Sequence, residues 1–292
     1  MAMLTDNLRG ALLMMGSMSA FTINDAFMKT VAADLPLMQS IFLRGVIVVP
    51  LMLILCRAMG QLRFDISRRD WHLILLRTVA EMIGAFLFIS ALFNMPLANV
   101  SAILQALPLT VTLAAALFFR EPLGWRRLTA ILVGFIGVLL IVRPGGADFN
   151  VFSLYAVAAV LVVTFRDLAA RRMSRDVPST LAALVAAAGV MLMAAMGLAF
   201  ETWQPVATSH VGLLIGAAVF IIGGYVFSVS AMRVGEISFV APFRYTSLLV
   251  ALILGFIIFG EVPKPLTLLG AAIVVAMGLF TLYREQRLKQ KA

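Results

Sequence analysis

Four charged side chains stand inside long apolar stretches of the sequence, namely Arg44, Arg77, Glu81 and Arg244. A charge inside a membrane-spanning helix costs several kcal/mol unless it faces a polar cavity or a partner, so each of these residues is a candidate for function. An arginine presents a planar fork of N–H donors that suits a carboxylate, and a glutamate can bind an ammonium group or exchange a proton. The chemistry that these residues suggest is the binding of small charged molecules.

Arg244 is the strongest of these candidates. It lies in the apolar run of residues 237–261, with Pro242 two positions before it and Tyr245 directly after it. Proline removes a backbone donor and can open a local kink that exposes carbonyl groups to a cavity. We therefore predict that Arg244 binds a substrate carboxylate, with Tyr245 as a neighbouring donor or ring surface. The alternative is that Arg244 bonds helix carbonyls as part of the interior packing.

Arg77 and Glu81 are four residues apart, so they share one face of a helix on which opposite charges can pair locally. One interpretation is a purely structural ion pair. The functional interpretation is that Glu81 binds a substrate ammonium group or exchanges a proton, while Arg77 closes a cytoplasmic gate. Both residues are therefore predicted members of the substrate site.

Three uncharged polar side chains complete the predicted substrate site. Gln105 is the inward-facing candidate of the fourth expected helix, with interhelical hydrogen bonding as the alternative. Tyr225 and Ser228 follow Gly223 and Gly224, a pair that lets a helix bend or another backbone approach closely. An aromatic wall there would suit apolar amino-acid side chains. The alternative is that these side chains face lipid or pack against other helices.

A second group of charges is predicted to serve gating or structure. Arg44 would either give an anion a second contact or seal the interface between the two halves of the chain by pairing with Asp25 or Asp167. Asp25, Arg166 and Asp167 lie closer to the ends of the predicted helices than the first four charges do.

The composition shows which elements must position these residues. Hydrophobic residues make up 62% of the 292 residues and charged residues 13%, and the mean hydropathy of +1.04 lies outside the range of soluble globular proteins. Apolar runs of about 20 residues, the length that crosses the hydrocarbon core, predict an all-α integral membrane protein with ten transmembrane helices. These helices are expected at residues 8–31, 36–57, 71–93, 97–119, 125–143, 151–171, 179–200, 210–232, 237–259 and 265–284.

Lysine and arginine residues are distributed unevenly between alternate connections. Sixteen fall on one predicted side of the membrane, whereas only Lys29, Arg143 and Lys264 fall on the other. Positive residues near helix ends stay in the cytoplasm, so both termini of this multi-pass protein are predicted to be cytoplasmic. Arg9 precedes the apolar segment 10–23, but no small-residue cleavage site leads into a soluble chain, so we expect a helix there and not a signal peptide.

The sequence lacks the motifs of ATP-driven transport and of hydrolytic enzymes. Residues 143–146 (RPGG) have glycines but lack the lysine and the Ser/Thr of a phosphate-binding loop. His72 and His210 are far apart and Cys56 is the lone cysteine, so neither a zinc site nor an internal disulfide is expected. The net charge of +9 forms no long basic tract, which argues against a nucleic-acid partner. We predict no enzyme activity, no cofactor and no metal.

The chain contains an internal repeat. At an offset of 142, five residues of the first half match five of the second: Thr22, Asp25, Lys29, Asp34 and Pro36 match Thr164, Asp167, Arg171, Asp176 and Pro178. At an offset of 140, Ala91, Val100, Leu109, Phe119 and Glu121 match Ala231, Val240, Leu249, Phe259 and Glu261. Each copy holds five helices, an odd number, so residues 1–147 and 148–292 are predicted to be two inverted repeats. Inverted repeats are typical of secondary transporters, whose site lies near the membrane midplane.

The repeat also sets Arg244 apart. At the offset of 140, the apolar Leu104 matches Arg244, and Gln105 matches Tyr245. A structural residue of a duplicated scaffold would be expected in both copies. The asymmetry therefore favours substrate recognition as the role of Arg244.

Both halves end their fourth helix with a glutamate, in FFREP (residues 118–122) and IFGE (residues 258–261), and continue into a glycine-bearing helix. Over essentially the whole chain this pattern resembles the EamA-type members of the drug/metabolite transporter superfamily. The early proline of the family pattern is matched in APFRYT (residues 241–246), whereas Pro108 of the first half comes later. Within the superfamily the chain looks most like the amino-acid exporter (YddG-like) branch.

The resemblance implies a ten-helix inner-membrane carrier with both termini in the cytoplasm, which moves small metabolites by alternating access, commonly outward. It also implies a central cavity lined largely by the third, fourth, eighth and ninth helices. We therefore predict a secondary transporter in the lipid bilayer that exports amino acids, aromatic ones among the candidates, and related small metabolites.

Two alternatives to amino-acid export stay open. Export of cationic drugs or nucleoside-like metabolites is disfavoured by the excess of arginine over acidic residues in the apolar runs. A channel usually shows rings of repeated polar residues or needs an oligomer, whereas a ten-helix unit could enclose its own path as a monomer.

Overall fold

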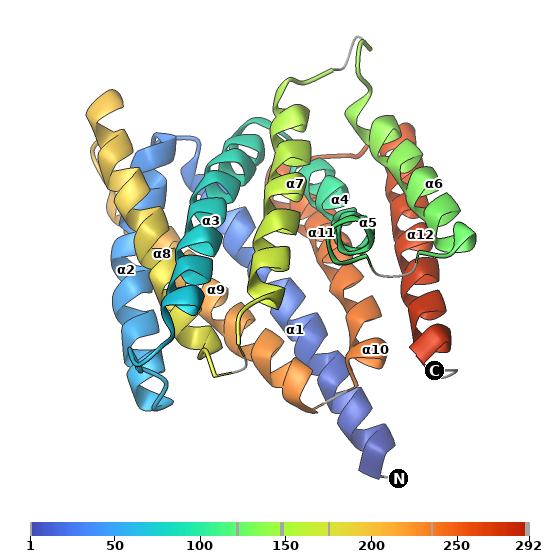
Figure 1. Cartoon of the computed structure of the whole chain (residues 1–292). Coiled ribbons are helices and arrows are strands. Elements are labelled where there is room, and N and C mark those ends of the chain that lie inside the picture. The colour runs from blue at the N-terminus through green and yellow to red at the C-terminus, as the bar shows by residue number, and fades with distance from the viewer. Residues whose placement is uncertain (1, 121–122, 147–148, 175, 235, 290–292) are drawn as a thin grey trace.

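The computed structural model describes residues 2–120, 123–146, 149–174, 176–234 and 236–289, and the regular elements of these residues are all helical (Figure 1). The predicted all-α fold is confirmed. The elements are α1 (Ala2–Val31), α2 (Leu37–Ala58), α3 (Arg68–Asn94), α4 (Leu97–Leu104), α5 (Leu107–Phe119), α6 (Trp125–Val142), α7 (Phe152–Arg171), α8 (Ser179–Gly197), η1 (Leu198–Phe200), α9 (Thr208–Val234), α10 (Ile237–Val240), η2 (Ala241–Tyr245), α11 (Thr246–Phe259) and α12 (Pro265–Lys289).

Ten membrane spans make up this bundle. Nine spans of the described chain are long and apolar enough to cross a membrane, with residues 97–119 and 241–259 each counted as one span. The tenth is α1, which carries Asp25 and Lys29 and packs along α9. Glu121, which was predicted to end the fourth helix, lies outside the described residues. Arg175 and Lys291, two of the sixteen basic residues counted on the cytoplasmic side, also lie outside them.

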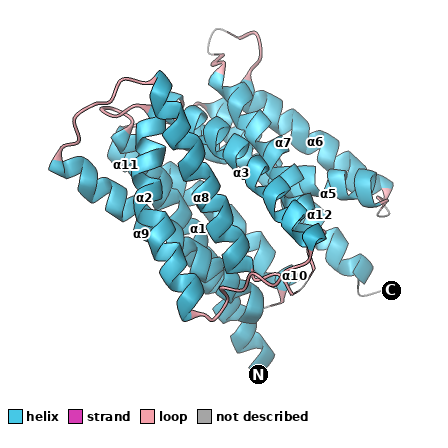
Figure 2. Cartoon of the chain, turned by 60° about the vertical axis from the view of Figure 1, so that its left-hand side comes forward, coloured by secondary structure: helices cyan, strands magenta, loops and turns pink. Residues whose placement is uncertain are grey.

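Each helix of the first half packs mainly on a helix of the second half. The pairs are α1 with α9, α3 with α7, α2 with α8 and α6 with α12, while α4 meets α11 (Figure 1, Figure 2). Hydrophobic side chains between these pairs form the buried core. The two halves therefore interleave into one bundle, and both chain termini lie at one end of it, called the terminal end below; the opposite end is the distal end (Figure 1).

The fourth and ninth spans are interrupted, whereas the sequence predicted continuous helices at 97–119 and 237–259. In the fourth span α4 ends at Leu104 and α5 begins at Leu107, and Pro108 near the start of α5 cannot donate the hydrogen bond that would close the preceding turn. In the ninth span Pro242 lies near the start of the 3₁₀ segment η2, between α10 and α11. Interrupted helices facing each other near the middle of the bundle are typical of transporter binding sites.

The two interrupted spans also end alike. Arg120 caps α5 and Gly260 caps α11, and both residues take the left-handed conformation, with φ of 56° and 64°. These positions are 140 residues apart, which is the offset of the sequence repeat. The described parts of the two spans thus share their break and their cap.

The α6–α12 pair shows why glycine is needed at one helix crossing. A methyl group added at Gly137 would lie 2.8 Å from the backbone oxygen of Gly270, and one added at Gly270 would lie 2.5 Å from the oxygen of Gly137. Small residues let helix backbones approach closely in membranes, where packing and not hydrophobicity drives association. The crossing therefore fixes α12 against α6.

Candidate functional site

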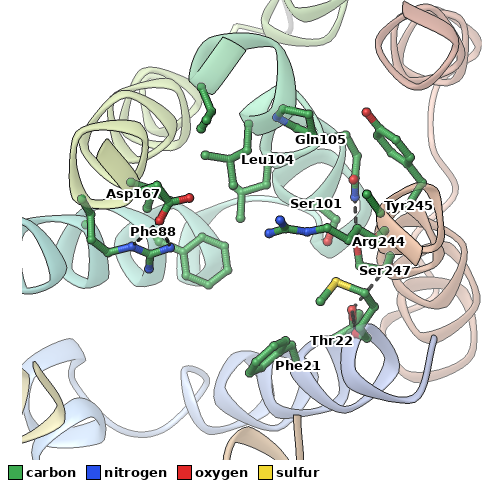
Figure 3. A pocket seen from close by; sticks show the side chains of 18 of the residues that line it. Phe21, Thr22, Phe88, Ser101, Leu104, Gln105, Asp167, Arg244, Tyr245 and Ser247 are labelled. Carbon is green, nitrogen blue, oxygen red and sulfur yellow. Dashed lines mark hydrogen bonds and ion pairs between the residues drawn. The ribbon is translucent and has the colours of Figure 1, made fainter. Parts of the chain in front are cut away.

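A cavity of about 590 Å³ lies between the two interrupted spans (Figure 3). This volume falls in the range of small-molecule sites. Its lining extends to the terminal end through Arg127, Arg171 and Leu282. The expected lining is corrected in one respect: α1 and α7, the first and sixth spans, form walls of the cavity, whereas α9, the eighth span, contributes only Ile221 and Met232.

Arg244 projects from η2 into this cavity (Figure 3). The side chain is exposed to the open space, and within the described part of the chain no carboxylate pairs with it and no helix carbonyl accepts a hydrogen bond from it. The packing alternative therefore finds no support among these contacts. A guanidinium without a counter-charge in a cavity is a site for an anionic group.

A hydrogen-bond network holds the backbone of Arg244 in place. Gln105, buried at the break of the fourth span, donates from Nε2 to Ser247 Oγ at 2.8 Å, and this hydroxyl donates to the carbonyl oxygen of Arg244 at 3.1 Å. On the other side, Thr22 Oγ1 of α1 lies 3.4 Å from the carbonyl oxygen of Ser247, while the carbonyl oxygen of Met18 is its closer acceptor at 2.9 Å. Gln105 thus both lines the cavity and makes the interhelical bond that was its alternative role.

Tyr245 contributes its ring and not its hydroxyl to the cavity wall. The residue is buried, and its tip packs against α12 so closely that no side chain would fit at Gly278. Figure 3 shows the phenol pointing away from the guanidinium of Arg244. Its oxygen makes no hydrogen bond to the residues that the structure describes. The predicted role as a donor beside the carboxylate is not seen in this arrangement.

Glu81 has a different main partner from the one predicted. Arg166 NH1 of α7 donates to both carboxylate oxygens of Glu81, at 3.2 and 3.1 Å, whereas the closest approach of Arg77 to Glu81 is 3.8 Å. Arg77 instead donates to the carbonyl of Ala182 in α8 at 3.0 Å and lies outside the cavity lining. Arg166 also donates to Asp167 Oδ1 from two nitrogens, at 3.0 and 2.8 Å. The predicted i,i+4 pair on α3 is therefore present as a long contact, and Arg166 and Asp167 extend it into an α3–α7 cluster.

Arg44 and Asp25 are connected by hydrogen bonds through Asn24. Arg44 NH1 donates to Asn24 Oδ1 at 3.3 Å, and Asn24 Nδ2 donates to Asp25 Oδ1 at 2.9 Å. The sequence predicted for Arg44 either a second contact to an anion or direct pairing with Asp25 or Asp167. The relay through Asn24 links α2 to α1 within the first half of the chain, so it does not seal the interface between the halves.

The aromatic wall of the cavity comes from Phe21 of α1 and Phe88 of α3 (Figure 3). Tyr225 and Ser228, predicted for this role, lie outside the cavity lining. Tyr225 packs in a hydrophobic cluster with residues of α2 and α8. The ring of Phe21 lies directly over Gly224, where an added methyl group would come within 2.8 Å of it. The glycine pair thus admits an aromatic side chain of α1 and does not interrupt α9.

A salt bridge closes the distal end of the bundle. Lys29 Nζ of α1 lies 3.2 Å from Glu261 Oε1 and donates to the carbonyls of Leu92, at 3.3 Å, and Met95 at the end of α3. The other oxygen of Glu261 accepts from the backbone N–H of Leu97, at 2.8 Å, and so caps α4. These contacts tie together the first, third, fourth and ninth spans, all of which border the cavity, on the side opposite to the lining that reaches the terminal end.

Sequence reasoning missed several residues of this site. Lys29 was counted as a loop charge, and Asn24, Thr22 and Ser247 were not assigned to the cavity. A signal for two of them was present, because Thr22 and Lys29 belong to the matched positions of the repeat. Asn24 and Ser247 carry no comparable signal, since a single amide or hydroxyl in a membrane helix is compatible with either face.

Comparison with known proteins gives a consistent family. The sequence profile of the EamA-like transporter family matches residues 8–143 and again residues 151–283. A riboflavin transporter of Vibrio cholerae is 35% identical over 210 residues, covering 70% of this chain and 68% of that protein. An S-adenosylmethionine uptake transporter of Rickettsia prowazekii is 27% identical over 196 residues, 66% of this chain and 65% of that protein.

Two further similarities extend over nearly the whole chain. The pseudopaline exporter of Pseudomonas aeruginosa is 27% identical over 278 residues, covering 91% of this chain and 93% of that protein. A solved crystal structure superposes with a TM-score of 0.68 at 20% identity over 96% of this chain and 98% of that one, which shows the shared fold. With its ten spans, its two matched halves and its central cavity, the chain belongs to the EamA-like transporter family and is a multi-pass membrane transporter.

Proposed function

We propose that this transporter carries amino acids and related small metabolites that possess a carboxylate, and that Arg244 binds this carboxylate. The observation that carries the proposal is the guanidinium of Arg244, which faces the cavity without a counter-charge among the described residues. The four other cavity arginines differ, because Arg44 and Arg166 each have acceptors on neighbouring helices, and Arg127 and Arg171 also have interaction partners. A substrate carboxylate would supply the missing partner with two parallel hydrogen bonds.

The apolar walls favour substrates with an aromatic or aliphatic body. Phe21, Phe88 and Leu104 border the space next to Arg244 (Figure 3). Aromatic rings contribute both buried area and preferred ring-to-ring geometries to a ligand. An aromatic amino acid would place its carboxylate at Arg244 and its ring along these walls.

We propose outward transport across the inner membrane, with both termini in the cytoplasm. The cavity lining reaches the terminal end of the bundle, and the Lys29–Glu261 salt bridge closes the distal end, so the site would load from the cytoplasm in this state. The excess of basic residues in the connections of the terminal end supports this orientation. Among the relatives described above, the pseudopaline exporter has the widest coverage and is named for outward transport. The S-adenosylmethionine transporter is named for uptake, and the name of the riboflavin transporter states no direction.

A second candidate substrate is a flat ring system without a carboxylate, such as riboflavin. The 35% identity to a riboflavin transporter and the pair of Phe21 and Phe88 favour it. S-adenosylmethionine combines both chemistries, since it carries an amino-acid head group and an adenine ring. The two candidates differ in one respect: transport of riboflavin would not depend on the charge of Arg244.

Counterflow in proteoliposomes tests both candidates. The full chain is reconstituted, and exchange of labelled L-phenylalanine, L-tryptophan, S-adenosylmethionine and riboflavin is measured with protein-free liposomes as background. Arg244→Gln is expected to raise the half-saturation concentration of carboxylate substrates about ten- to hundred-fold, as expected for loss of hydrogen bonds to a charged group, and Arg244→Lys to raise it less. Saturable exchange separates a carrier from a channel.

Two results would overturn the proposal. The first is that no carboxylate-bearing member of the panel exchanges above background. The second is that Arg244→Gln leaves every half-saturation concentration unchanged while the protein elutes as a single folded species. Exchange of riboflavin alone, insensitive to Arg244→Gln, would establish the second candidate instead.

A further inference from the structure

We propose that Asp167 binds the ammonium group of a substrate whose carboxylate is held by Arg244. The inference rests on the proposed function and assigns the chemistry of the second pole of the same cavity. Asp167 lies on α7 and Arg244 on η2, and Figure 3 shows them on opposite walls with Leu104 and Phe88 beside the space between them. A molecule with an ammonium group and a carboxylate would meet an opposite charge at each pole.

The contacts of Asp167 leave one carboxylate oxygen available. Oδ1 accepts from Nε and NH2 of Arg166, at 3.0 and 2.8 Å, whereas no described residue donates to Oδ2. The side chain is 33% exposed, and Figure 3 shows its carboxylate turned toward the cavity. Since an ionised carboxylate offers about four acceptor sites on its two oxygens, Oδ2 can accept from an ammonium group without displacing Arg166.

Arg166 is the counter-charge closest to Asp167. Arg166 serves two carboxylates at once, because its NH1 group also donates to both oxygens of Glu81. Arg77 NH2 lies 3.8 Å from Glu81 Oε2, and Arg77 NH1 donates a hydrogen bond to the carbonyl oxygen of Ala182 in α8. One closely hydrogen-bonded guanidinium is thus shared by two carboxylates. With Arg77 included, the α3–α7 cluster holds two guanidinium groups and two carboxylates, so the positive charge of a substrate ammonium group at Asp167 would be offset by the carboxylate of the same substrate.

Asp25, the repeat mate of Asp167, is already engaged differently. It occupies the matching position on α1 at the offset of 142 and also lines the cavity. Its Oδ1 accepts from Nδ2 of Asn24, whose own Oδ1 accepts from Arg44, so Asp25 is joined to Arg44 through a neutral amide and has no direct ion pair among the described residues. Asp25 therefore provides a matched control, an acidic residue in the same cavity that is not assigned to the ammonium group.

The test compares ligands that differ only in the ammonium group. Dissociation constants of L-phenylalanine, N-acetyl-L-phenylalanine and 3-phenylpropionate are measured by isothermal titration calorimetry with the purified full chain. We expect the unaltered protein to bind L-phenylalanine about ten- to hundred-fold more tightly than either analogue. Asp167→Asn, which keeps an acceptor for Arg166, should remove this preference by weakening L-phenylalanine alone, whereas Asp25→Asn should preserve it.

Each other outcome overturns a defined part of the argument. Equal affinities of the unaltered protein for L-phenylalanine and the two analogues would exclude an ammonium site, whether or not the variants fold, and would leave the carboxylate site at Arg244 standing. Equal weakening of L-phenylalanine and 3-phenylpropionate in Asp167→Asn would assign Asp167 a structural role. Absence of binding of all three ligands would overturn the amino-acid substrate itself, and the ammonium site with it.

Discussion

The salt bridge between Lys29 and Glu261 predicts how the distal end of the transporter can be opened. The two side chains are only 12% and 17% exposed, and Lys29 also donates to two carbonyls at the end of α3. Replacing Lys29 by methionine would leave the carboxylate of Glu261 partly buried and without its cation. Breaking a buried ion pair by removing one partner costs about 3–5 kcal/mol.

This cost falls on the closed distal end and not on the fold as a whole. In a state with an open distal end, Glu261 could regain water, so the substitution should shift the ratio of open to closed distal ends by about a hundred-fold or more. The double variant Lys29→Met with Glu261→Gln should shift the ratio less, because it leaves no unpaired charge and Gln can still accept from the N–H group of Leu97.

Cysteine labelling measures this shift. The lone Cys56 is replaced by alanine, and a single cysteine is placed at Ser101, which lines the cavity from α4. A membrane-impermeant maleimide added from the distal side should label this cysteine slowly in the parent protein and much faster with Lys29→Met. Lys264→Met, an exposed lysine at the same end, is the matched control and should leave the rate unchanged.

One result would refute the role of the salt bridge. If Lys29→Met left the labelling rate at Ser101 unchanged while the protein kept its gel-filtration profile, the distal closure would not depend on this pair. The helix packing of α4 against α11 would then be sufficient to close that end.

Three further predictions concern stability and binding. Gln105→Leu removes the 2.8 Å bond to Ser247 and should lower the thermal unfolding temperature of the purified protein, by the equivalent of about 0.6–2 kcal/mol, and weaken substrate binding. Gly137→Ala should destabilise by about 1–3 kcal/mol because its methyl group meets a backbone oxygen of α12, whereas Gly223→Ala, with nothing within 4 Å, should not; denaturation in detergent measures both. Arg77→Met should lower stability but leave the half-saturation concentration in counterflow unchanged, because Arg77 binds a carbonyl of α8 outside the cavity.

The helices could be predicted from the sequence because apolar runs of membrane length leave little choice of secondary structure. The interruptions could not. Pro108 and Pro242 show where a backbone donor is missing, but a proline can kink a helix or split it, and the outcome depends on neighbouring helices. Here the side chains of Gln105 and Ser247 join the two breaks, and that contact spans 142 residues of sequence.

The presence of Arg244 in the cavity could be predicted from the sequence, whereas contacts that depend on helix pairing could not. Arg244 could be singled out from its charge, its neighbouring proline and its lack of a counterpart in the repeat. The partner of Glu81 could not, because a spacing of four favours Arg77, whereas the packing of α3 on α7 brings Arg166 closer. The prediction that Tyr225 lines the cavity was wrong for a similar reason. The helix α1 covers the middle of α9, and Phe21 of α1 lies there over Gly224.

The repeat separates the scaffold of the transporter from its binding site. Matched residues do comparable structural work in both halves: the left-handed caps Arg120 and Gly260 end the interrupted spans at equivalent positions. In the cavity, the matched pair of Leu104 and Arg244 has diverged, whereas the matched pair of Asp25 and Asp167 is identical, and all four residues line the same space. A duplicated scaffold needs symmetry to close at either end, whereas an asymmetric substrate needs two different poles. The asymmetry of the cavity therefore arises on the fourth and ninth spans, where Leu104 and Gln105 match Arg244 and Tyr245.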